Sequence, residues 1–299
     1  MTDPGHGEAE AERQVLRALR LAIELTLVVL VVESVGAVLS RSLSLTVDAV
    51  HNVPDALAFA VSYFALRSAG EGTSDSYTFG THRAEVFAGL ANAALVLATG
   101  LLFAYVAVDA FVHGGTYDGP VSAEWLLFGA APTLVLRGVT AVRLGRIPGR
   151  VRDLNFRSVV LHVASDMAIG AAIVLVGVVL LLRPGANWVD PAAALGIAVV
   201  LVVESAPLFR DSWEVLSERT PRHLSVPAIE RTALAVPGVT GIHDVHVWAV
   251  CPTLVCLTAH VGVKEMTVRG SMEVVGQLRD AVAAEHGILH AVFEVEAAP

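Results

Sequence analysis

Charged residues are scarce in this chain. Asp, Glu, Lys and Arg make up 16% of its 299 residues, whereas hydrophobic residues make up 55%. A typical soluble domain carries about 25% charged residues, so the composition argues against an ordinary soluble protein and indicates a membrane protein. An apolar run of about 20 residues is long enough to cross a hydrocarbon layer roughly 30 Å thick as a helix. Six such runs occur, near residues 17–39, 45–67, 85–112, 123–144, 158–182 and 188–209.

Cysteine is also scarce, with only Cys251 and Cys256. Both fall in the C-terminal part of the chain, where we expect packed thiols of a reducing compartment rather than a disulfide.

The first dozen residues, MTDPGHGEAEAE, are acidic and lack the basic segment and short apolar core of a signal peptide, so we expect the first apolar run to be retained. The basic loop RLGRIPGRVRDLN contains no histidine, which argues against a histidine-rich metal-gathering tract there.

The arginines predict the orientation of the six runs. Those expected on one side of the membrane are Arg13, Arg17, Arg20, Arg67, Arg83, Arg143, Arg146, Arg150, Arg152, Arg157, Arg210, Arg219 and Arg222. Only Arg41 and Arg183 fall on the other side. Loops rich in Lys and Arg stay in the cytoplasm, so both termini are expected there. We therefore predict a six-helix transmembrane domain over residues 1–212 and a cytoplasmic domain over residues 213–299.

The sequence pattern of the predicted cytoplasmic domain indicates a small α+β unit. Helical spacing in VPAIERTALAV is followed by two alternating stretches, TGIHDVHVWAV and LVCLTAHVGV, which predict a hairpin. The next segment, SMEVVGQLRDAVAAEHG, predicts a helix capped by Ser271 and ended by Gly287. A final strand follows in ILHAVFEVE. This α-β-β-α-β order predicts a ferredoxin- or metallochaperone-like layer, with helices on one face of an antiparallel sheet.

Two of the apolar runs carry the same polar pair. In TVDAVHNVPDALAF, His51 and Asp55 are four residues apart, which places both side chains on one face of a helix. The run LNFRSVVLHVASD repeats the spacing with His162 and Asp166. An ionised carboxylate at mid-membrane costs about 2.5 to 3.5 kcal/mol on insertion scales, so such groups usually face a partner, a cavity or an ion path.

Together the two pairs offer two imidazoles and two carboxylates. That set suits tetrahedral Zn²⁺ at roughly 2.0 to 2.2 Å, whereas Mg²⁺ prefers oxygen ligands with retained water and Cu⁺ prefers sulfur. A single buried histidine more often satisfies a neighbour, and polar side chains also join transmembrane helices, but the repeated spacing favours a metal site. Asp48 is expected to support His51, because a ligating histidine commonly donates its other N–H to a carboxylate. Five other polar residues of the runs are expected to pair or pack rather than bind metal: Glu24, Glu33, Asn92, Asp109 and Arg137.

Four stretches, in this order, resemble the cation diffusion facilitators: SLSLTVDAVHNVPDALA, YTFGTHRAEVFAGLANAALVL, LNFRSVVLHVASD and VPGVTGIHDVHVW. The resemblance covers nearly the whole chain. It implies a homodimer in the cell (inner) membrane that exports a divalent cation, usually against proton flow. It also implies that His51, Asp55, His162 and Asp166 form the transport site, with zinc favoured. Pro54 departs from the expected pattern, because proline removes a helix hydrogen bond and can bend a helix.

In relatives of this family the cytoplasmic domain also binds zinc. The matching positions are His243, His260 and Glu296, with His290 as a further candidate six residues before Glu296 on the last strand. Strand alternation places His246, three residues after His243, on the opposite face. The implied partners are divalent metal ions, protons, the lipid bilayer and a second copy of the chain, and no nucleic acid is expected.

Three other readings remain open at this point. The exported ion could be Cd²⁺, Co²⁺ or Fe²⁺, because preference depends on geometry and availability as well as ligand type. A non-transporting membrane metal sensor would use the C-terminal domain as its working part. A membrane metalloenzyme is disfavoured, since the chain has no His-Glu-x-x-His motif and four protein ligands leave no open position for water.

Overall fold

The computed structural model describes residues 4–68, 75, 77–113, 119–145 and 154–297. Within these ranges the side chains of residues 4–19, 22, 59, 62–68, 140, 143–145 and 154–163 lie outside the description. The chain divides into two compact units. The N-terminal unit comprises Met1–Glu71 and Ala91–Leu208, and the C-terminal unit comprises Gly72–Leu90 and Phe209–Pro299. A division between residues 212 and 213 remains a prediction.

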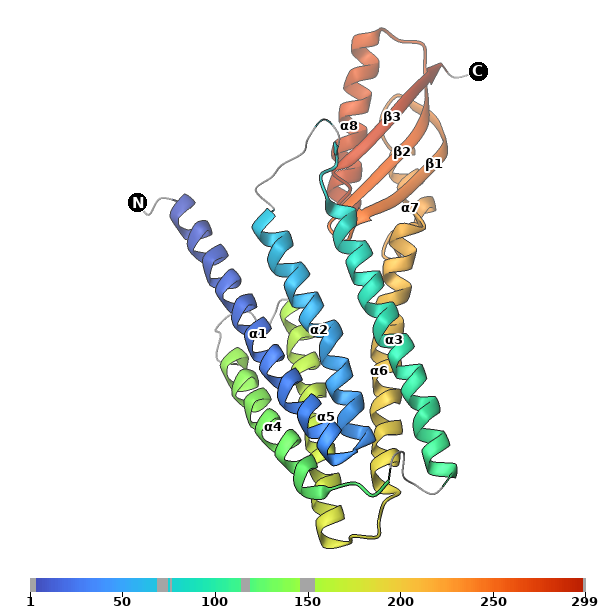
Figure 1. Ribbon diagram of the computed structural model, residues 1–299. Helices are drawn as coiled ribbons and strands as arrows, with labels where there is room; N and C mark the ends of the chain where they lie inside the picture. The colour runs from blue at the N-terminus through green and yellow to red at the C-terminus, as the bar shows by residue number, and fades with distance from the viewer. Residues whose placement is uncertain (1–3, 69–74, 76, 114–118, 146–153, 298–299) are drawn as a thin grey trace. The chain divides into compact units, whose positions relative to one another are not determined.

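Each predicted apolar run coincides with a helix (Figure 1). The helices are α1 (Pro4–Ser40), α2 (Leu43–Ser68), α3 (His82–Val112), α4 (Ala123–Gly145), α5 (Leu154–Leu182) and α6 (Val189–Leu216). Within the N-terminal unit α1 packs against α2 and α4, and α4 packs against α5. Small residues allow these approaches: a Cβ atom added at Gly36 of α1 would lie 2.7 Å from the Cα atom of Gly129 on α4.

Among the residues whose side chains the structure describes, four stretches are long and apolar enough to cross a membrane: Ile23–Ser40, His82–Val112, Ala164–Leu182 and Val189–Leu216. They expose large apolar side chains, such as Val38, Tyr105 and Leu182, each more than two-thirds accessible. Such surfaces are expected where helices face lipid rather than water. The uninterrupted described side chains of α2 and α4, at residues 43–58 and 123–139, are shorter than the 18 residues that define these stretches. The number of six spans therefore remains a prediction, whereas the long apolar helices support a helical transmembrane domain.

A buried carboxylate holds the start of α2. Asp190, at the beginning of α6, accepts hydrogen bonds from the backbone N–H groups of Leu43 and Ser44 at 2.6 and 3.2 Å. It also accepts from the hydroxyls of Ser42 and Ser44 at 2.6 and 2.5 Å. Asp190, Ser42 and Ser44 are each at most 2% exposed. The first N–H groups of a helix have no partner within the helix, so Asp190 supplies for α2 what a local cap would supply.

The C-terminal unit contains α7 (Val226–Leu234), β1 (Val239–Cys251), β2 (Leu254–Val263), α8 (Val268–His286) and β3 (His290–Ala297). Its α-β-β-α-β order and the β1–β2 hairpin confirm the prediction. The sheet order is β1-β2-β3, and its core includes Ile229, Leu257 and Leu278. Cys251 and Cys256 are buried free thiols, as expected.

Two local predictions for this unit were wrong. The sheet is mixed rather than antiparallel, because β3 pairs with β2 in parallel. Two parallel neighbouring strands need a long crossover connection, and α8 provides it between β2 and β3. An antiparallel β3 could have followed β2 through a short turn. The cap of α8 is Thr267, whose hydroxyl accepts from the Gly270 N–H at 3.2 Å, while Ser271 donates to the Val268 carbonyl inside the helix. Gly287 ends α8 in the left-handed region with φ 69°, as expected.

Candidate metal sites

The first candidate site joins α2 to α5 inside the N-terminal unit. His51 Nε2 lies 3.5 Å from Asp55 Oδ2 and 3.9 Å from Asp166 Oδ1. One ligand atom from each of the three residues fits within 4.8 Å of the others. Ligand atoms around a tetrahedral Zn²⁺ lie roughly 3.3 Å apart, so these distances are close to those of a binding site. His51 is only 5% exposed, whereas the Asp55 and Asp166 side chains are 12% and 19% exposed.

The structure therefore brings together three of the four residues predicted for this site. His162 belongs to α5, but its side chain lies outside the described residues. The helix α2 continues through Pro54, which lies between the two predicted ligands of this helix. Because proline has no N–H, the Val50 carbonyl loses its usual helix partner beside the site.

A buried ionic network adjoins the first site. The guanidinium of Arg137 on α4 forms a two-pronged contact with Asp48, at 3.1 and 3.2 Å, and lies 3.1 Å from Glu33 Oε1 on α1. Asn52 donates to Glu33 Oε2 at 2.6 Å. The carboxylate of Asp48, which the sequence suggested as a support for His51, is thus occupied by an arginine from another helix. The expected pairing of Glu33 and Arg137 is present.

Sequence reasoning missed two carboxylates of α6. One is Asp190, which holds the start of α2. The other is Glu204, which accepts a hydrogen bond from Ser165 at 2.6 Å, and Ser165 directly precedes Asp166. Both are acidic residues of an otherwise apolar run, and that signal alone marks an intramembrane residue for attention.

The second candidate site lies on the sheet of the C-terminal unit. His243 Nε2 is 3.0 Å from Glu296 Oε2, and His260 Nδ1 is 2.8 Å from Glu296 Oε1. The two imidazoles stack with their centroids 5.2 Å apart. These residues come from β1, β2 and β3, so the strand pairing places them side by side. Two imidazole nitrogens and a carboxylate form a donor set that suits zinc, with room for a further ligand.

Hydrogen bonding shifts the pKa values in this second cluster in opposite directions. The bond to Glu296 raises the pKa of His260, and the nearby carboxylates of Glu294 and Asp244 act in the same sense. The same bond, with a second one from His243, lowers the pKa of Glu296. The cluster therefore favours a protonated imidazole beside an ionised carboxylate when no metal is bound.

His290 lies apart from this cluster. It is opposite Cys256 at the start of β3, and its ring packs edge-on against Phe79 with centroids 5.3 Å apart. The prediction for His246 was wrong, because β1 has an irregularity between His243 and His246. His243 pairs with His260 and His246 pairs with Thr258, so the inserted residue turns both histidines to the same face.

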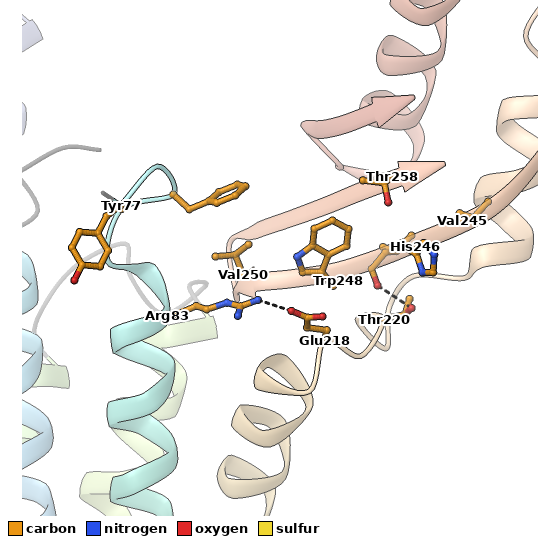
Figure 2. Close-up of a pocket in the computed structure, with 12 residues that line it drawn as sticks. Tyr77, Arg83, Glu218, Thr220, Val245, His246, Trp248, Val250 and Thr258 are labelled. Atoms are coloured by element: carbon orange, nitrogen blue, oxygen red, sulfur yellow. Dashed lines mark hydrogen bonds and ion pairs between the residues drawn. The ribbon is translucent and has the colours of Figure 1, made fainter. Parts of the chain in front are cut away.

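A pocket of about 810 Å³ lies beside the same sheet, within the C-terminal unit. Figure 2 shows Trp248 and His246 of β1, Thr258 of β2 and Arg83 among the residues that line it. Arg83 lies 3.1 Å from Glu218 at its rim. Neither metal-ligand cluster identified among the described residues belongs to this pocket.

Comparison with known proteins gives two family models over nearly the whole chain. Residues 19–217 match the model described as the cation efflux transmembrane domain, and residues 221–298 match the cation efflux protein cytoplasmic domain. The metal cation efflux system protein CzcD of Cupriavidus metallidurans is 30% identical over 95% of this chain and 87% of its own length. The cadmium, cobalt and zinc/H⁺-K⁺ antiporter of Bacillus subtilis is 28% identical over 89% of this chain and 84% of its own length.

Two further similarities are more distant or more limited. The proton-coupled zinc antiporter SLC30A2 of Mus musculus is 24% identical over 87% of this chain and 72% of its own length. A solved structure of the metal-bound C-terminal domain of the CzcD transporter shares 33% identity. It covers 24% of this chain and 99% of its own, with a TM-score of 0.23, which is too low to support an argument about the fold.

Proposed function

Because the chain belongs to the cation efflux family, whose members are secondary active transporters and not enzymes, we propose that it exports Zn²⁺ from the cytoplasm in exchange for protons. The ion would bind His51, Asp55 and Asp166, with His162 as the fourth ligand by its spacing from Asp166. The relatives' names include zinc, cadmium and cobalt, so zinc as the cargo of this chain rests on the ligand chemistry. Two imidazoles and two carboxylates are a borderline-soft set that suits Zn²⁺.

The convergence of His51, Asp55 and Asp166 carries this proposal. Three ionisable side chains from two helices, far apart in sequence, meet where isolated charges would be costly. Histidine also gives the site a way to release its cargo, because a proton and a metal ion compete for the same imidazole nitrogen. Alternating access then requires that the α2–α5 site open to each side of the membrane in turn.

We also propose that His243, His260 and Glu296 bind zinc in a regulatory role, and that the chain acts as a homodimer in the cell (inner) membrane with both termini in the cytoplasm. Support for the metal role comes from the short distances within the cluster. Support for the orientation comes from the arginine distribution along the sequence. A sensor without transport remains the second candidate, because this exposed cluster could bind zinc without any flux.

The test is zinc uptake into proteoliposomes containing the purified full-length chain, with an imposed pH gradient. His51→Ala, Asp55→Ala, His162→Ala and Asp166→Ala should each reduce zinc flux to the level of empty liposomes, because each removes one proposed ligand. Asp109→Ala is the matched control. It removes a carboxylate of α3 that pairs with His113 and is 53% exposed, and it should transport like the wild type.

Zinc flux that survives any of the four ligand substitutions would exclude the proposed site. Cd²⁺, Co²⁺, Fe²⁺ and Mn²⁺ are assayed in the same vesicles, and faster transport of one of them would replace zinc as the cargo. Zinc binding without any flux of the wild-type chain would instead support the sensor.

A further inference from the structure

Arg137 is the one buried arginine among the described side chains, with 8% of its surface exposed. An arginine in the middle of an apolar helix is costly, so it is normally found where its charge is matched and its donors are used. Asp48 and Glu33, at 1% and 0% exposed, provide two carboxylates for this one guanidinium. Arg137, Asp48 and Glu33 therefore form a buried ionic cluster, and the arginine side chain does not extend to the surface.

The contacts of Arg137 reach three other helices. From α4 it contacts Asp48 on α2 and Glu33 on α1, both through charged hydrogen bonds. Its Nη1 also donates to the main-chain carbonyl of Asp166 on α5 at 3.0 Å. A planar guanidinium can make these contacts together because its donors have a fixed fork geometry, which a lysine ammonium lacks. One residue of α4 thus contacts α1, α2 and α5, including both helices that carry the first metal cluster.

The backbone of α5 is shaped to admit this contact. Gly170 lies one turn after Asp166, and a Cβ atom added there would lie 3.4 Å from Arg137 Nη1. A longer side chain at this position would occupy the space that the guanidinium uses. A Cβ atom at position 170 would already be in van der Waals contact with the guanidinium, so a small residue there keeps open the space that Arg137 uses.

We propose that Arg137 is a positioning residue of the transport site. It holds the backbone of Asp166 on α5 and the carboxylate of Asp48 on α2 in one arrangement, and thereby sets the separation between the ligand atoms of His51, Asp55 and Asp166. This inference rests on the proposed function of that cluster. Arg137 does not contact the cargo. It affects transport by fixing the distance between α2 and α5. Small displacements of the ligands weaken a metal site strongly.

The test compares Arg137→Gln and Arg137→Lys with the wild type for zinc transport in proteoliposomes, using only protein that elutes as the wild type does from a sizing column. Arg137→Gln should raise the KM for zinc by about 10- to 100-fold, the usual cost of losing a group that orients a metal ligand. The turnover at saturating zinc should fall by less than the KM rises. Arg137→Lys should give an intermediate KM, because it keeps the charge but cannot make the forked contact and reach the carbonyl together.

A double variant separates positioning from charge balance. Arg137→Gln alone leaves Asp48 and Glu33 without a counter-charge, whereas Arg137→Gln with Asp48→Asn keeps the net charge of the ionised network unchanged. The double variant also serves if the single one does not fold. Its KM should stay raised, because the link between α2 and α5 is still missing. A wild-type KM in the double variant, or in Arg137→Lys, would overturn the inference and leave only a charge effect.

The control Arg20→Gln removes an arginine of α1 whose side chain is 74% exposed and pairs with Glu24, and it should leave the KM unchanged. His51→Ala in the same series separates the two levels of the argument. Zinc flux in His51→Ala would show that the transport site itself is misassigned. Loss of flux in His51→Ala together with a wild-type KM in Arg137→Gln would overturn only the role of Arg137.

Discussion

His260 connects the chemistry of the C-terminal cluster to pH. Its pKa is raised above the ordinary value of about 6.5 by the hydrogen bond to Glu296. A raised histidine pKa stabilises the fold fully below the ordinary value, and this contribution is lost as pH rises through the raised pKa. The lowered pKa of Glu296 acts in reverse: its contribution is present above the ordinary carboxylate value and is lost as pH falls through the lowered pKa. The ion pair therefore stabilises the unit between these two pKa values.

Zinc binding at this cluster should strengthen as pH rises, because the metal must displace the proton from His260. We expect the apparent Kd to fall by about tenfold per pH unit, the slope for one displaced proton, up to the raised pKa of His260 and to level off above it. The measurement is chelator competition from pH 6 to pH 8 on the full-length chain carrying Asp55→Ala and Asp166→Ala, which removes two ligands of the proposed transport site.

The control for this pH dependence is Glu294→Gln. The carboxylate of Glu294 lies 3.8 Å from His260 Nε2 and helps to raise its pKa, but it is outside the proposed ligand set. In this variant the apparent Kd for zinc should stop falling at a lower pH than in the wild type, and zinc binding should be retained. A Kd that does not change across the range would contradict the assignment of His260 as a ligand.

Helix α2 is tied to α6 at its first turn by Asp190, so its stability should depend on a residue more than a hundred positions away. Asp190→Ala removes the acceptor for four donors in a site that water does not reach. Leaving a single buried donor unpaired costs about 1 to 3 kcal/mol, and the loss of a cap costs about 0.5 to 2 kcal/mol. We expect a clear fall in the Tm of the purified protein, followed by circular dichroism in detergent, with a smaller fall for Asp190→Asn.

Asp211→Ala is the matched control for this substitution, because it removes a carboxylate of the same helix that is 61% exposed. Surface ion pairs contribute about 0 to 1 kcal/mol, so its Tm should stay near that of the wild type. An Asp190→Ala protein as stable as Asp211→Ala would show that α2 does not need the cap.

The elements differ in how far the sequence predicts them. Apolar runs and alternating stretches predict the helices and the hairpin, because burial imposes a period on each element. The parallel pairing of β3 and the irregularity of β1 depend on which strand lies alongside, which a local pattern does not specify. The same division holds at the first candidate site: the repeated spacing predicts the proposed ligands, and the structure brings His51, Asp55 and Asp166 together. The partner of Asp48 is Arg137, 89 residues away, and only the packing of α2 against α4 determines it.

Proton coupling is a property of the whole molecule, since it requires one site, two access states and a driving gradient. If protons replace Zn²⁺ at His51 and the carboxylates, a pH gradient alone should drive zinc uphill into vesicles whose interior is acidic, because internal protons leave as zinc enters. Reversing the gradient should reverse the direction of net zinc movement, and a protonophore should abolish accumulation while leaving downhill exchange. The measurement is the zinc concentration inside vesicles under each gradient, with Asp55→Ala vesicles as the blank. Equal accumulation with and without the gradient would rule out proton antiport and leave a facilitated metal pathway through the same site.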